Sequence, residues 1–82
     1  MYKIDISKCA LKFIAKQPKP QQELLLKAIS KLPTGDIKPL KGHKNVYRLR
    51  VDAFRIIYTI DNGQMVICVI DAGNRGQIYK RY

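Results

Sequence analysis

Residues 46 to 60 read VYRLRVDAFRIIYTI, and this stretch decides how the chain folds. Apolar and basic side chains alternate from Val46 to Val51, and a second apolar segment, Phe54 to Ile60, follows after only two residues. Alternation with a period of two is typical of a strand with one buried face, and a short connection between two such strands is typical of a hairpin. The stretch therefore predicts two adjacent antiparallel strands.

The register of this hairpin determines where its arginines point. If the two residues between the strands form the turn, Arg50 lies opposite Arg55, and Arg48 projects from the same face two residues away. Like charges opposed across strands destabilise a sheet, so three arginines with no carboxylate at matching parity indicate a site for an anion. The other face is predicted to form a core beneath helices, from Tyr47, Leu49, Phe54, Ile56, Tyr58 and Ile60.

Upstream of the hairpin, the spacing of apolar residues changes to three and four. A short strand is predicted at Tyr2 to Asp5, and Ser7 is a suitable N-cap for a helix that runs to Lys16. A second helix is predicted from Pro20 to about Lys31, because proline is favoured in an opening turn. These two helices would form a helical hairpin.

The remaining segments complete the predicted fold. Prolines and glycines between residues 33 and 44 predict a loop, and Asp61-Asn62-Gly63 predicts a turn before a third strand, Gln64 to about Ala72. The prediction is an α+β fold, with an N-terminal helical hairpin packed on one face of a twisted antiparallel β-sheet. At 82 residues, the chain 1–82 is expected to be one domain.

The charge of the chain restricts its partners. The formal net charge is +10, which favours a polyanion or an acidic protein. All the arginines lie in the C-terminal half, and the planar guanidinium suits bidentate contacts with phosphate better than the lysine ammonium does.

Hydropathy and cysteine content point to the cytoplasm. The longest apolar run, Met65 to Ile70, is far shorter than a membrane span, so we expect no membrane association and a cytoplasmic protein. Cys9 and Cys68 have no metal or redox spacing and are predicted to be buried, reduced side chains.

Four segments in this order resemble the RelE/ParE superfamily of bacterial type II toxins: Leu40–Gly42, Tyr47–Val51, Phe54–Tyr58 and Gly73–Tyr79. The resemblance covers nearly the whole chain and is strongest from Leu40 onward. It implies two N-terminal helices on a twisted antiparallel sheet. It also implies a ribosome-dependent endoribonuclease that cuts mRNA in the decoding site and is inhibited by a cognate antitoxin.

The resemblance also implies which residues act. The family's basic and aromatic positions match a predicted catalytic set of Arg48, Arg50, Arg55, Arg75 and Tyr79. Further contacts with mRNA or ribosomal RNA are expected from Lys41, His43, Lys44, Lys80 and Arg81. The chain departs from the family at Asn74, where relatives often have histidine or lysine, and in having no room for a long C-terminal helix.

The residue inventory favours metal-independent chemistry without a cofactor. A single histidine excludes a paired-histidine mechanism, and the scattered carboxylates do not suggest a two-metal site. In the alternative mechanism, the ribose 2′-hydroxyl attacks the adjacent phosphorus while the protein stabilises the phosphoryl charge. We assign charge stabilisation to the strand arginines, the scissile phosphate to Arg75, and the role of base or orienting group to Tyr79.

Two other functions fit the same sequence. A ParE-like inhibitor of DNA gyrase would share the fold without nuclease chemistry. A noncatalytic RNA-binding module would show salt-sensitive RNA binding without cleavage.

Overall fold

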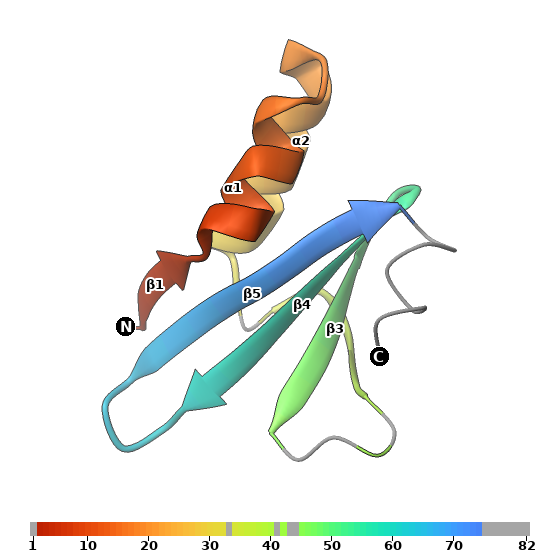
Figure 1. The fold of residues 1–82 in the computed structure, drawn as a ribbon. Coiled ribbons are helices and arrows are strands. Elements are labelled where there is room, and N and C mark those ends of the chain that lie inside the picture. Colours follow the sequence, from red (N-terminus) through yellow and green to blue (C-terminus); the bar gives the residue numbers. More distant parts are fainter. Residues whose placement is uncertain (1, 33, 41, 43–44, 75–82) are drawn as a thin grey trace.

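A five-stranded β-sheet with a pair of helices forms the fold (Figure 1). The computed structural model describes residues 2–32, 34–40, 42 and 45–74. The elements in chain order are β1 (Lys3–Ile6), α1 (Lys8–Ala15), α2 (Lys19–Ser30), β2 (Asp36–Pro39), β3 (Val46–Val51), β4 (Phe54–Asp61) and β5 (Val66–Asn74).

The sheet is mixed, with the strand order β1-β5-β4-β3-β2. The predicted meander of β3, β4 and β5 is confirmed as antiparallel, and these strands fan out in Figure 1 because the sheet is twisted. The prediction of a wholly antiparallel sheet is wrong, because β1 pairs with β5 in parallel. This pairing joins opposite ends of the chain, so local periodicity does not reveal it.

The predicted β3–β4 hairpin has the expected register. Val51 lies opposite Phe54, and Arg50 lies opposite Arg55. Asp52, in the connection, has a φ of 52°, a left-handed conformation that aspartate adopts more readily than most residues because its side chain can form local hydrogen bonds. The hairpin thus turns tightly without a glycine.

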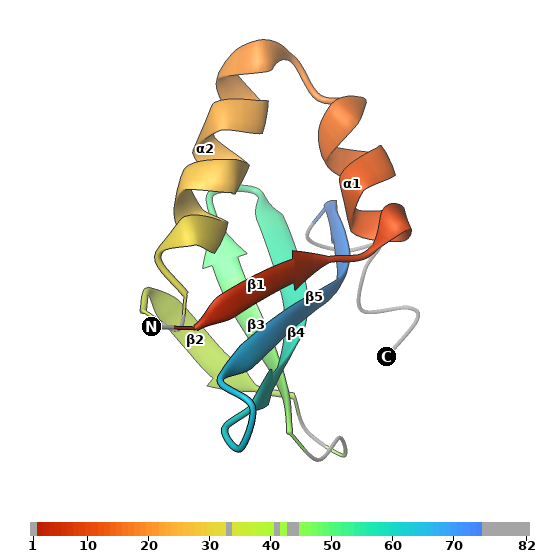
Figure 2. The same ribbon diagram turned by 90° about the vertical axis from the view of Figure 1, so that its left-hand side faces the viewer.

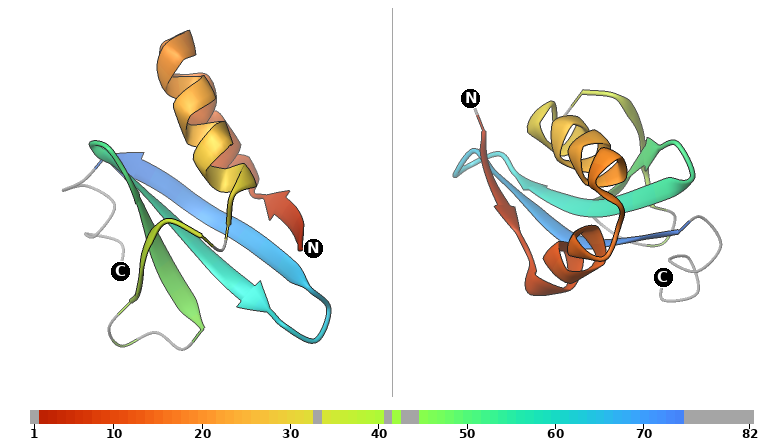
Figure 3. Two further views of the ribbon diagram at one scale, coloured as in Figure 1. Left: turned by 180° about the vertical axis from the view of Figure 1, so that it is seen from behind. Right: turned by 90° about the horizontal axis from the view of Figure 1, so that it is seen from above.

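Both predicted helices are present within a residue or two of their expected bounds, and Figure 2 shows them as an antiparallel pair. Ser7 caps α1 as predicted, since its Oγ accepts a hydrogen bond from the Ala10 amide at 3.2 Å. The same Oγ donates to the Ile70 carbonyl of β5 at 2.9 Å, which ties the start of α1 to the sheet. Figure 3 shows the helical pair from behind and from above.

The core lies between the helices and one face of the sheet. The rings of Phe13 in α1 and Phe54 in β4 meet edge to face, with their centroids 5.8 Å apart. Tyr47 and Tyr58 stack across β3 and β4 at 5.6 Å. The predicted core face is confirmed, with Tyr47 and Ile60 partly buried at its margin; the buried cluster also includes Ala10, Ile14, Leu25, Ile29, Leu32, Val51, Ile67, Val69 and Ala72.

The predicted loop at 33–44 contains a strand. β2 pairs with β3 from Asp36 opposite Arg50 to Pro39 opposite Tyr47. Its short length and its proline suit an edge strand, which needs hydrogen bonds on one side only. Gly35 precedes it with a φ of +120°, and a Cβ there would lie 2.9 Å from Leu49 Cδ1, so glycine lets this segment approach the core.

The cysteines differ from their predicted burial. Cys9 is exposed at the start of α1, so the prediction that it is buried is wrong, and Cys68 in β5 is half-buried. In the first turn of α1, Ala10 is buried in the core, whereas Cys9 is exposed although its Sγ lies 3.4 Å from Asp71 Oδ1 of β5. Within the described ranges, no helix is long and apolar enough to cross a membrane.

Tyr58→Phe is expected to raise the free energy of unfolding by about 1 kcal/mol at pH 7, because the buried Tyr58 hydroxyl has no hydrogen-bond partner among the described residues. Burial, and then the nearby Tyr47, raise the pKa of Tyr58 to about 12. An unfolded tyrosine has a pKa near 10, so ionisation of the unfolded state should weaken the wild type as pH rises from about 10 to 12. Urea unfolding of the wild type and the variant at neutral and at alkaline pH measures the two free energies of unfolding. A Tyr58→Phe variant that is less stable than the wild type at either pH would contradict the prediction.

Candidate functional site

Three arginines project from the sheet face opposite the helical core, as the register predicts. They differ strongly in exposure. Arg50 is exposed, the side chain of Arg48 is 11% exposed, and Arg55 is only 4% exposed. A buried guanidinium has lost most of its hydration, so it gains more from an anion than an exposed one does.

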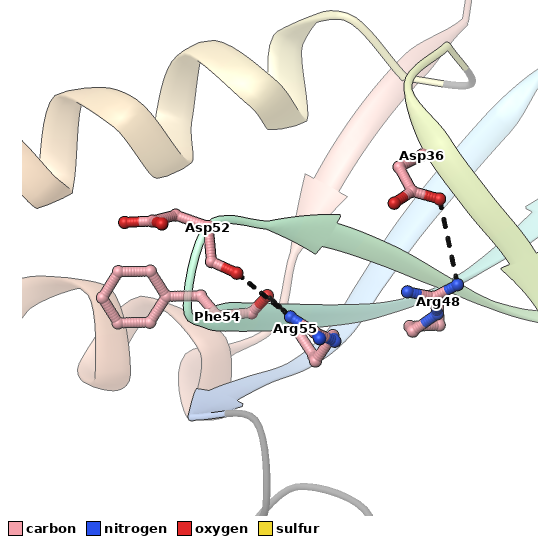
Figure 4. A network of polar contacts seen from close by, with 5 residues as sticks. All are labelled: Asp36, Arg48, Asp52, Phe54 and Arg55. Atoms are coloured by element: carbon pink, nitrogen blue, oxygen red, sulfur yellow. Dashed lines mark hydrogen bonds and ion pairs between the residues drawn. The ribbon is translucent and has the colours of Figure 1, made fainter.

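Arg55 is held by backbone carbonyl groups. Its Nη1 donates to the carbonyl oxygen of Phe54 at 2.9 Å and to that of Asp52 at 3.2 Å (Figure 4). Among the described residues, its buried Nε has no hydrogen-bond partner, and no carboxylate forms an ion pair with it. The site therefore contains a desolvated positive charge with an N–H donor that this part of the fold does not use.

Arg48 has a carboxylate neighbour that the sequence analysis did not anticipate. Asp36 Oδ1 of β2 lies 4.0 Å from Arg48 Nη2, and the Asp36 side chain is 52% exposed (Figure 4). The prediction that this face lacks a carboxylate at matching parity is wrong, because it treated β2 as a loop. Because the carboxylate is half exposed and lies 4.0 Å away, the attraction is weak, and Asp36 offsets only part of the charge of Arg48.

Arg50 also borders a separate hollow next to α2. A cavity of about 320 Å³ there is lined by the apolar residues Leu24 and Leu49, by the basic residues Lys27, Lys31 and Arg50, and by the acidic Asp36. Arg50 thus connects the arginine face with a basic rim on the helical side of the molecule.

Asp71 is a buried polar residue that the sequence analysis missed. A register shift between Ile57 and Tyr58 of β4 leaves an extra residue in β5, and Asp71 follows it. Its Oδ1 accepts from the Ala72 amide at 2.8 Å and from Cys9 Sγ at 3.4 Å. A single aspartate within an apolar strand is the only sequence signal for it. A cavity of about 270 Å³ beside it is also lined by Lys12 and Lys16.

The other residues predicted to act lie outside the described residues. They are Arg75 and Tyr79 of the catalytic set, and Lys41, His43, Lys44, Lys80 and Arg81 of the RNA-binding set. Within the described part of the chain, no group of three His, Cys, Asp or Glu residues is placed to hold a metal ion. What this part offers chemically is charge stabilisation of an anion, through Arg55, the partly buried Arg48 and the exposed Arg50.

The family of the chain follows from a sequence model. The model described as "ParE toxin of type II toxin-antitoxin system, parDE" matches residues 4–79. The chain therefore belongs to the ParE toxin family, within the RelE/ParE superfamily of type II toxins. A comparison with curated protein sequences found no match.

Solved structures show the same fold. The archaeal RelE–RelB complex from Pyrococcus horikoshii aligns with a TM-score of 0.77 and 24% identity, covering 93% of this chain and 97% of that chain. The Methanococcus jannaschii RelB–RelE complex gives 0.76 and 22%, covering 95% and 98%. The isolated E. coli RelE toxin gives 0.70 and 21%, covering 99% and 94%. The predicted RelE-like α+β fold is thereby confirmed.

Asp36→Asn is expected to strengthen binding of a single-stranded oligonucleotide up to about fivefold, because one unit charge 4.0 Å from Arg48 is worth about 1 kcal/mol in water. Stability should change by less than about 1 kcal/mol, since the Asp36 carboxylate is half exposed and lies 4.0 Å from Arg48. Fluorescence anisotropy with a 2′-O-methylated RNA at low salt measures the affinity. Asp5→Asn, an exposed carboxylate on the opposite edge strand, is the matched control; an equal gain there would show a general charge effect.

Proposed function

We propose that this toxin is a metal-independent, ribosome-dependent endoribonuclease that cleaves mRNA and so inhibits translation. The observation that carries the proposal is the buried guanidinium of Arg55, whose Nε has no partner and whose charge no carboxylate pairs within the described part of the chain. Burying such a charge is costly unless an anion joins it. The phosphodiester of an RNA chain supplies that anion.

The proposed reaction uses the RNA's own nucleophile. The ribose 2′-hydroxyl loses its proton and attacks the neighbouring phosphorus, and the bond to the 5′-oxygen of the next nucleotide breaks. That oxygen takes up a proton from solvent, so the products are a 2′,3′-cyclic phosphate and a free 5′-hydroxyl. Arg55 stabilises the phosphoryl oxygens as their charge grows, and the exposed Arg50 and the partly buried Arg48 approach the flanking phosphates. Tyr79 accepts the proton of the 2′-hydroxyl or orients it, and Arg75 contacts the scissile phosphate.

The need for a ribosome follows from the acidity of these groups. A guanidinium stays protonated and an ordinary phenol stays neutral near pH 7, so neither transfers protons readily there. Such an enzyme gains most from a partner that holds the 2′-hydroxyl in line with the leaving oxygen. Ribosomal RNA would bind the basic surface of the toxin through phosphate contacts, and a cytoplasmic location is part of the same proposal.

A cognate antitoxin is the second proposed partner. The structures of Pyrococcus horikoshii and Methanococcus jannaschii RelE contain RelB, described as an antitoxin for the second complex. With a net charge of +10, the present toxin would be complemented by an acidic antitoxin segment over the arginine face.

Inhibition of DNA gyrase is the alternative function. The matching family model is that of ParE, and this observation favours a gyrase inhibitor. The arginine face favours the nuclease, because a protein that only binds gyrase has no evident need for a desolvated cation poised for phosphate.

Arg55→Gln is expected to lower the rate of mRNA cleavage on ribosomes by at least about 100-fold, because it removes charge stabilisation at the phosphoryl group. Purified toxin is added to ribosomes stalled on a defined mRNA, and new 5′ ends are mapped by primer extension. Lys19→Gln removes one exposed charge from α2 and is the matched control; a ribosome-free reaction tests dependence on the ribosome.

If wild-type toxin arrests growth but cuts no mRNA, the nuclease proposal fails and supercoiling by gyrase is assayed. Salt-sensitive RNA binding without cleavage or gyrase inhibition would indicate the noncatalytic module.

Tyr79→Phe and Arg75→Ala are each expected to lower cleavage by about 100-fold or more, since each removes a group assigned to proton transfer or to the scissile phosphate. Binding of a 2′-O-methylated RNA should change little with Tyr79→Phe, because the phenol acts on the 2′-hydroxyl that this RNA lacks. The same primer-extension assay measures cleavage. Unchanged cleavage by the Tyr79→Phe variant would remove the tyrosine from the mechanism.

A further inference from the structure

The β3–β4 turn contains a residue in an unusual conformation beside the buried arginine. Asp52 has a φ of 52°, and its carbonyl oxygen accepts a hydrogen bond from Arg55 Nη1 at 3.2 Å. The adjacent Phe54 carbonyl accepts from the same nitrogen at 2.9 Å. In Figure 4 the carboxylate of Asp52 points away from Arg55, and only its carbonyl group is directed at the guanidinium.

We infer that Asp52 is a positioning residue for the anion site: the left-handed backbone at Asp52, not its carboxylate, holds the Arg55 guanidinium through Nη1 and leaves its positive charge for a phosphate. The inference rests on the proposed role of Arg55 as a phosphate ligand. An aspartate next to an arginine would usually be interpreted as its ion-pair partner. Here the backbone carbonyl of Asp52 acts on Arg55 instead, and the carboxylate does not.

The physical reason is the difference between a carbonyl and a carboxylate as acceptors. A carboxylate on Nη1 would neutralise the guanidinium and weaken its attraction for a phosphate. Two carbonyl oxygens hold the same nitrogen by neutral dipoles and leave the net positive charge intact. They also occupy one side of the guanidinium only, because both accept from Nη1 while the buried Nε has no partner among the described residues.

The conformation of Asp52 is what directs its carbonyl oxygen. Asparagine and glycine adopt a positive φ readily, whereas a β-branched residue strongly disfavours it. Substitution to asparagine therefore removes the charge and keeps the backbone, while substitution to valine removes the charge and opposes the backbone. Asp52 is exposed, so neither change removes a core contact.

The test is a titration of the full-length toxin with inorganic phosphate, followed by the ¹⁵N–¹H signal of Arg55 Nε. Wild type and Asp52→Asn should both show a phosphate-dependent shift, and Asp52→Val should lose it. Binding of a 2′-O-methylated RNA should agree, since the slope of log affinity against log salt should fall by about 0.7 in Asp52→Val, as in Arg55→Gln, and stay at the wild-type value in Asp52→Asn.

Two results would overturn the inference while leaving the arginine as a phosphate ligand. One is a folded Asp52→Val protein that keeps the phosphate shift and the salt slope. The other is an Asp52→Asn protein that loses both, which would make the carboxylate the active group. If Asp52→Val does not fold, the wild-type protein still tests the inference. A guanidinium held by the two carbonyl groups should give separate Nη1 and Nη2 signals for Arg55. A single averaged signal would show that the guanidinium rotates freely and would refute the inference.

These outcomes are distinct from failure of the nuclease proposal. Phosphate and the methylated RNA bind without a ribosome and without cleavage, so a toxin that cuts no mRNA can still show the Asp52 effect. A wild-type Nε signal that neither ligand moves would instead refute Arg55 as an anion ligand, and the positioning role with it.

Discussion

The pairing of β3 with β4 is the constraint on which the rest of the structure depends. A shift of β3 by one residue relative to β4 would move Tyr47 and Leu49 from the core face to the opposite face and bring Arg48 and Arg50 beneath the helices. Burial of those apolar side chains therefore keeps the register, and the register in turn sets Arg50 opposite Arg55. The repulsion between the two charges is a consequence of the core, not a feature that the fold avoids.

The arginine face combines three electrostatic situations within two adjacent strands. Arg50 is hydrated, Arg48 has a distant and exposed carboxylate neighbour, and Arg55 is buried on carbonyl oxygens. An RNA backbone presents phosphates at regular intervals. If RNA binds this face, Arg55 would bind one phosphate strongly and its neighbouring arginines would bind the flanking phosphates weakly. In the proposed reaction, the phosphate at which charge develops binds the most buried cation, because electrostatic stabilisation is strongest where water is excluded.

The sequence predicted those helices and strands whose pattern is contained in a few consecutive residues. The Ser7 cap, the two helices and the β3–β4 register all follow from short-range spacing, and the structure confirms them. β2 was not predicted, because the sequence of a four-residue edge strand with a proline resembles that of a loop. For the same reason the position of Asp36 beside Arg48 was not predicted. The burial of Asp71 was not predicted, because it depends on a bulge in β5 and on contact with α1.

By itself, the sequence determined that a basic hairpin would present three arginines on one face, because the period of two and the short connection admit one register. Only the tertiary structure decided that Arg55 is the buried member, that Asp36 lies near Arg48, and that backbone carbonyls hold the Arg55 guanidinium. The reason is physical. Burial and hydrogen-bond geometry depend on how strands and turns meet in space, and the order of residues along one strand does not contain that information.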